Sequence, residues 1–156
     1  LLVLWLLYIH HSKMEFTLKS TTEGQLILVD KPLQITSFQV VNKIRWGLKS
    51  KYNRNKLKVG HAGTLDPLAS GLLIICTGKM TKKINELQDL EKTYTGTITL
   101  GATTASYDLE TPIDEEFPIS HLNEEGLIAA TKKFKGEIDQ YPPIYSAIKK
   151  KGKRLY

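Results

Sequence analysis

The chain has 156 residues, of which 41% are hydrophobic, and this is enough for one globular domain with its own core. Its formal net charge of +6 favours a polyanionic partner, nucleic acid before membrane, although charge alone does not identify the partner. The single cysteine, Cys76, excludes a disulfide within the chain and argues against a cysteine-based zinc site, so we expect a buried thiol and a reducing, cytoplasmic compartment.

The first residues differ in character from the rest of the chain. Residues 1–9 are almost wholly apolar, but this stretch is far shorter than the roughly 20 residues of a membrane-spanning helix. It also lacks the basic leader and small-residue cleavage site of a signal peptide. Because Met14 opens an ordinary soluble sequence, we interpret residues 1–13 as a non-native or disordered leader. A clipped signal sequence is the alternative, which mass spectrometry of the natural N-terminus would test.

Two short apolar runs predict buried strands. The first spans residues 24–30 and ends before Lys31-Pro32, a pair that predicts a turn. The second spans residues 72–76 and is bounded by glycines.

Between these runs the sequence predicts an amphipathic helix with Ser37 as its N-cap. Apolar residues follow at three- and four-residue steps and form one helix face: Phe38, Val41, Ile44 and Leu48. Residues 43–58 then carry seven lysines and arginines and no acidic residue. A solvated face usually explains such a run. Here no carboxylate neutralises the charge, so we expect contact with phosphate.

The loop at residues 60–71 contains the candidate for chemistry. It is polar, carries one histidine and one carboxylate, His61 and Asp66, and leads into the second strand. Because Pro67 follows Asp66, the helical conformation is disfavoured at Asp66 and its carboxylate points in a restricted direction. A functional side chain on a loop anchored to a buried strand is well held.

The second half of the chain mixes elements irregularly. Residues 80–89 predict a short helix, and residues 93–100 alternate between apolar residues and threonine, which predicts a half-buried strand with Tyr94 on its inner side. Residues 108–125 carry seven acidic residues and two prolines, as in a solvated loop. A helix is expected from Asn123 to Gly136. This mixture without regular βαβ alternation indicates an α+β fold.

The sequence argues against several kinds of functional site. No metal site is expected, because His61, Asp66 and Cys76 lack the spacing of metal ligands. No phosphate-binding loop ending in Gly-Lys-Ser/Thr is present, and no second carboxylate shares the setting of Asp66. A lone aspartate, acting as nucleophile or base beside a basic surface, indicates a protein that acts on RNA or DNA.

Residues 60–71, Gly-His-Ala-Gly-Thr-Leu-Asp-Pro-Leu-Ala-Ser-Gly, closely resemble the signature of the TruB family of tRNA pseudouridine synthases. Further matches follow in the family's order: Asp30-Lys31-Pro32 with Thr36-Ser37, Lys92-Thr93-Tyr94, Leu100-Gly101, Phe134-Lys135-Gly136 and Pro142-Pro143-Ile144-Tyr145-Ser146. The resemblance implies a pseudouridine synthase-like catalytic domain, with a mixed, largely antiparallel sheet flanked by helices. Residues 14–156 would form the N-terminal part of that domain.

The resemblance also implies roles for three residues. Asp66 matches the family's catalytic aspartate, which attacks the target uridine. The uracil is then detached, turned and rejoined through C5, without cofactor or metal. His61 matches the histidine that helps to fill the gap left by the flipped base, and Tyr94 matches the tyrosine that stacks on this base. A role for Tyr94 in the core alone is the alternative.

The implied function is the conversion of uridine to pseudouridine at position 55, in the T loop of tRNA. The enzyme is expected to be cytoplasmic and monomeric and not to bind a membrane. Candidate phosphate contacts are Lys31, Lys43, Arg45, Lys58 and Lys149. A non-catalytic RNA-binding or RNA-folding fragment and an RNA-guided rRNA pseudouridine synthase are the alternatives. Two departures from the family pattern stand out: Gln34 replaces a usual glycine, and the arginine that pairs with the nucleophile lies beyond Tyr156.

Overall fold

The computed structural model describes residues 17–139, 149–150 and 153–154. The chain forms two compact units, divided between Thr93 and Tyr94, and each is described by itself. The predicted leader, residues 1–13, lies outside the described residues, and a single partial catalytic domain over residues 14–156 stays a prediction.

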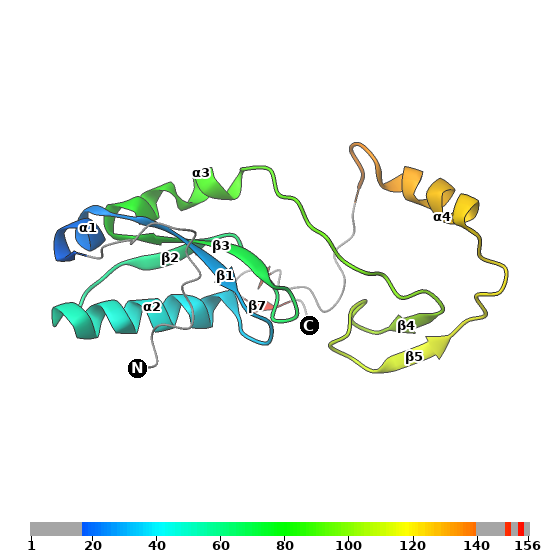
Figure 1. Ribbon diagram of the computed structural model, residues 1–156, viewed down its shortest axis with the longest axis horizontal. Helices are drawn as coiled ribbons and strands as arrows, with labels where there is room; N and C mark the ends of the chain where they lie inside the picture. The colour runs from blue at the N-terminus through cyan, green and yellow to red at the C-terminus, as the bar shows by residue number, and fades with distance from the viewer. Residues whose placement is uncertain (1–16, 140–148, 151–152, 155–156) are drawn as a thin grey trace. The chain divides into compact units, whose positions relative to one another are not determined.

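The first unit is a three-stranded antiparallel sheet with helices (Figure 1). Its elements in chain order are α1 (Leu18–Glu23), β1 (Leu26–Lys31), α2 (Ser37–Tyr52), β2 (Val59–Ala62), β3 (Gly71–Thr77), the 3-10 helix η1 (Gly78–Lys83) and α3 (Ile84–Gln88). The central strand is β3, which pairs with β1 on one side and β2 on the other. Both predicted strands and the α+β class are therefore confirmed.

The core of the first unit lies between the sheet and α2. Alternate residues of the strands point to the same side, and these are fully buried, for example Val29 and Ile75. They pack against the inner side of α2, where Val40, Val41 and Leu48 are buried. Burial of each such side chain stabilises the fold by about 1.5–3 kcal/mol. This packing holds β1, β2 and β3 in place and fixes the loops at their ends.

The start of α2 corrects two details of the predicted helix. The N-cap is Thr36, whose hydroxyl accepts a hydrogen bond from the Gln39 backbone N–H, and the Gln39 side chain accepts one from the Thr36 N–H. Ser37 is instead the first helical residue and is buried. Phe38 does not join the core face, because it is 59% exposed, and Val40 takes its place there.

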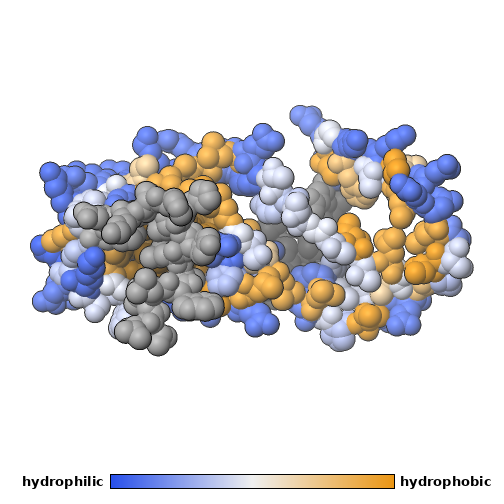
Figure 2. Space-filling view, in the orientation of Figure 1, coloured by the Kyte–Doolittle hydropathy of each residue, from blue (hydrophilic) through white to orange (hydrophobic). Residues whose placement is uncertain are grey.

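The described part of the second unit contains two small antiparallel sheets, one α-helix and one 3-10 helix. Its elements are β4 (Ala102–Thr104), β5 (Ile113–Glu116), α4 (Glu124–Thr131), the 3-10 helix η2 (Lys132–Phe134), β6 (Lys149–Lys150) and β7 (Lys153–Arg154). As predicted, Asn123 caps α4, with its side chain accepting from the Gly126 N–H. Many apolar side chains of this unit are open to solvent, as the orange residues on the right of Figure 2 show.

Two predictions for the second half of the chain are wrong. Residues 93–100 form no strand, and their side chains are all exposed. An alternating pattern becomes a strand only where a neighbouring strand pairs with it, and no strand of the described chain does so here. Conversely, residues 113–116 form β5 within the expected acidic loop. Hydrogen bonds to β4 stabilise this strand, and its residues are exposed. Its sequence therefore has no apolar pattern from which a strand could be predicted.

Candidate functional site

The loop that carries Asp66 connects β2 and β3 at the end of the sheet where β1 also finishes. Glycines with positive φ stand at both ends of the loop, Gly63 at 95° and Gly71 at 120°. Asp66 is exposed, and its backbone carbonyl accepts a hydrogen bond of 3.0 Å from the Ala69 N–H. Among the described residues no donor hydrogen-bonds to the Asp66 carboxylate, and the side chain is exposed.

The backbone on either side of Asp66 is fixed by the turn that leads into α2. The Ser37 hydroxyl accepts a hydrogen bond of 2.9 Å from the Leu65 N–H and donates one of 3.0 Å to the Leu65 carbonyl. On the other side, the Gln34 N–H donates to the Pro67 carbonyl at 2.7 Å. Since Ser37 is only 2% exposed, its two bonds to Leu65 are partly shielded from water. Asp66 is thus held between two anchored neighbours.

Gln34 has a strained backbone conformation in this turn. Its φ is 65°, in the left-handed region that favours glycine, and a side chain there costs roughly 1–2 kcal/mol. A glycine at this position, as in the family pattern, would adopt the observed φ without this cost.

Lys31 corrects a sequence prediction, because it is fully buried and cannot contact phosphate in this structure. Its ammonium group donates hydrogen bonds to the carbonyls of Pro32 at 2.9 Å and Ile35 at 2.8 Å. Burial lowers the pKa of Lys31, and the negative charge of Asp66 acts in the opposite direction and raises it. Lys31 therefore braces the turn that anchors the Asp66 loop, and it is a positive charge close enough to sense the Asp66 carboxylate.

His61 lies on β2, opposite Ile75 of β3, and is partly buried. Its Nδ1 is 2.5 Å from the Gly63 carbonyl oxygen. Because a carbonyl oxygen only accepts, we assign the proton to Nδ1, and none of the described residues hydrogen-bonds to Nε2. His61 is thus the third residue of β2, and Asp66 lies in the loop that follows this strand. Tyr94 lies in the second unit, where it is 70% exposed.

The other predicted phosphate contacts differ in availability. Lys43 and Lys58 are exposed. The Arg45 guanidinium is largely committed, because it donates to the Val59 carbonyl at 2.7 Å and to the Asn42 side chain at 2.9 Å. Lys149 is in β6, and its side chain lies outside the described part of the structure.

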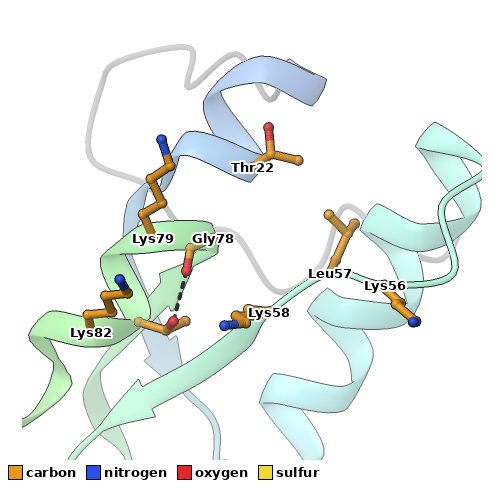
Figure 3. A pocket seen from close by; sticks show the side chains of 8 residues that line it. Thr22, Lys56, Leu57, Lys58, Gly78, Lys79 and Lys82 are labelled. Atoms are coloured by element: carbon orange, nitrogen blue, oxygen red, sulfur yellow. Dashed lines mark hydrogen bonds between the residues drawn. The ribbon is translucent and has the colours of Figure 1, made fainter.

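A basic pocket lies at the far end of the sheet, where the Gly78 N–H donates to the Lys58 carbonyl at 2.9 Å. It has a volume of about 230 Å³ and draws its lining from α1, the segment before β2 and η1 (Figure 3). No acidic residue lines it, whereas four lysines do: Lys56, Lys58, Lys79 and Lys82. The six residue steps of β3 separate this pocket from the Asp66 loop by about 20 Å.

Sequence reasoning missed the anchoring role of Ser37 and Gln34. Both roles depend on backbone groups about 30 positions away, and the only local signal was the match of Thr36-Ser37 to the family pattern. Cys76 is fully buried as predicted, and burial raises the pKa of its thiol. In the described ranges, no three His, Cys, Asp or Glu side chains gather as a metal site would require. Every helix there is too short or too polar to cross a lipid bilayer.

Comparison with known proteins gives a consistent result. Residues 49–156 match the N-terminal domain of the TruB family pseudouridylate synthases. The chain is 62% identical over 135 residues to the tRNA pseudouridine synthase B of Flavobacterium johnsoniae, covering 86% of this chain and 59% of that protein. The protein of the same name from Phocaeicola vulgatus is 54% identical over 134 residues, again 86% of this chain, and 57% of its own length is covered. The chain thus spans less than two thirds of these relatives.

Proposed function

Because this chain belongs to the TruB family of pseudouridylate synthases, we propose that it is part of an enzyme that converts uridine to pseudouridine in tRNA. The observation that carries the proposal is the Asp66 loop, in which an exposed carboxylate is held between anchored backbone groups at Leu65 and Pro67. Such preorganisation suits a nucleophile, whose reacting atom has to be placed accurately.

In the proposed reaction, a carboxylate oxygen of Asp66 attacks the target uridine, at C1′ of the ribose or at the base. The bond between C1′ and N1 breaks, the uracil turns, and a new bond forms between C1′ and C5. The bond between the Asp66 oxygen and the substrate breaks before the product leaves, and this restores the carboxylate. The C5 proton is lost and N1 gains a proton, so the product is an isomer of the substrate. Atoms and electrons balance within the nucleotide, and the step therefore needs no redox cofactor.

Access to the uridine requires that the base leave its stack, at a cost of a few kcal/mol. Stacking of the flipped base on Tyr94 would stabilise the flipped state by about 1–3 kcal/mol. His61 would occupy the space that the base leaves behind. Tyr94 is also the candidate to remove the C5 proton.

For RNA binding we propose that exposed lysines contact the phosphate backbone. Lys43 on α2 and Lys58 in the basic pocket support this, because both are exposed and no carboxylate pairs with them in the described chain. Arg45 stays a weaker candidate, because its guanidinium already hydrogen-bonds within the fold. Lys149 stays a candidate whose side chain lies outside the described part of the structure. The T stem-loop as the RNA element, a monomeric state and a cytoplasmic location belong to the same proposal.

The proposal is tested with the full-length protein and tRNA that carries tritium at C5 of uridine. Isomerisation at the target uridine releases this tritium into water, and we expect release without any added guide RNA. Binding of tRNA without release would favour a non-catalytic RNA-binding protein. Release that depended on a guide RNA would favour the RNA-guided alternative.

A further inference from the structure

The outward side of α2 carries an exposed tryptophan that the core does not use. Trp46 is 71% exposed, although it lies in the middle of a helix whose buried residues include Val41 and Leu48. With 3.6 residues per turn, Trp46 is on the opposite side of α2 from these residues. It therefore contributes nothing to the packing of α2 on the sheet, and its large ring is available to a partner.

The neighbours of Trp46 on this side of the helix are cationic or polar. Lys43 and Lys49 stand three residues before and after it, and Asn42 stands four residues before it. Lys43 and Lys49 form no ion pair within the described chain, and α2 contains no acidic residue. We call the surface formed by Asn42, Lys43, Trp46 and Lys49 the Trp46 face.

The charge of the Trp46 face selects the kind of partner. A second protein that covered Trp46 would have to bring carboxylates to both lysines and an apolar surface to one isolated ring. A nucleic acid strand supplies a negative charge at every nucleotide and a base that stacks on an aromatic ring. Arg45 borders this face, because its guanidinium donates to the Asn42 side chain, and its second bond, to the Val59 carbonyl, fixes α2 against β2. The face is thereby held on a rigid part of the fold.

We propose that the Trp46 face is a second RNA-binding site, in which an unpaired base stacks on Trp46 and Lys43 and Lys49 contact the flanking phosphates. This inference takes its RNA partner from the proposed function but assigns a site outside the Asp66 loop. The site binds and orients the RNA and takes no part in bond breaking.

The test uses the full-length protein and its tRNA substrate. Trp46→Ala is expected to raise the Kd for tRNA about 5- to 150-fold, the range that loss of one stacked base implies. Trp46→Phe should restore most of the affinity, because a ring remains. The single-turnover rate of tritium release at saturating tRNA should be unchanged. Lys43→Ala and Lys49→Ala should each weaken the salt dependence of tRNA binding. The slope of the logarithm of the association constant against the logarithm of salt concentration should fall in magnitude by about 0.7–0.9 for each lost phosphate contact.

Phe38→Ala is the matched control, since Phe38 is a similarly exposed aromatic residue of α2 with no lysine within one turn. It should leave the Kd within about twofold of wild type. A Kd that Trp46→Ala also leaves unchanged would overturn the proposal, and so would a loss that Trp46→Phe fails to restore. A change in oligomeric mass without a change in Kd would assign the face to a protein partner. Failure of the proposed function is distinct, since wild type would then bind tRNA without releasing tritium.

Discussion

Removal of the Ser37 hydroxyl is expected to weaken the fold and the reaction together. Ser37→Ala deletes both hydrogen bonds to Leu65 and leaves the partly buried Leu65 N–H and carbonyl without these partners. Each hydrogen bond contributes about 0.5–1.5 kcal/mol, and an unsatisfied buried group costs about 1–3 kcal/mol. We therefore expect the free energy of unfolding to fall by about 1–3 kcal/mol. Because Leu65 directly precedes Asp66, release of this anchor displaces the carboxylate, and a displacement of 1 Å can cost about 100-fold in rate.

Urea unfolding and single-turnover tritium release measure these two effects. Ser50→Ala is the matched control, because Ser50 is an exposed serine of the same helix. The expected result is a loss in both assays for Ser37→Ala and in neither for Ser50→Ala. If Ser37→Ala matched the control in stability and rate, the anchoring of Asp66 through Leu65 would be refuted.

Three further outcomes follow from other residues. Gln34→Gly should raise the free energy of unfolding by about 0.5–1 kcal/mol, because relief of left-handed strain exceeds the entropy that glycine adds to the unfolded chain; Gln34→Ala, which keeps the strain, should show no gain. The buried Lys31 has a lowered pKa, so between that pKa and its ordinary value near 10.5 the unfolded chain binds more protons. Stability relative to Lys31→Met should therefore rise with pH in that window, and a pH-independent difference in urea unfolding would contradict this. Cys76 should react with a thiol reagent only after unfolding, because its thiol is buried and its pKa is raised; rapid labelling of native protein would contradict its burial.

The parts of the fold that the sequence predicted are those encoded by local pattern. The runs at residues 24–30 and 72–76 are apolar and bounded by turn residues, and both became strands of the main sheet. Residues 93–100 show why a pattern is insufficient, because their alternation found no pairing strand in the described structure. Pairing depends on residues far away in the chain, which a local window does not include.

The candidate catalytic residues could be predicted from the sequence, but the residues that hold them in position could not. Asp66 and His61 were recognised from the motif at residues 60–71; in the structure His61 is in β2, opposite Ile75, and Asp66 is in the loop that connects β2 and β3. Lys31 was expected to contact phosphate, yet two carbonyls of the following turn accept hydrogen bonds from its ammonium group inside the fold. The Ser37 anchor likewise depends on the Leu65 backbone, which only the folded chain brings near.

The central claim is that the Asp66 carboxylate is the nucleophile, and one comparison tests it most directly. Tritium release from C5-labelled tRNA should be abolished by Asp66→Asn in the full-length protein, while the Kd for tRNA stays close to that of wild type. Asp89→Asn changes an exposed aspartate at the end of α3 and should retain full release. Turnover by Asp66→Asn at the rate of this control would contradict the account.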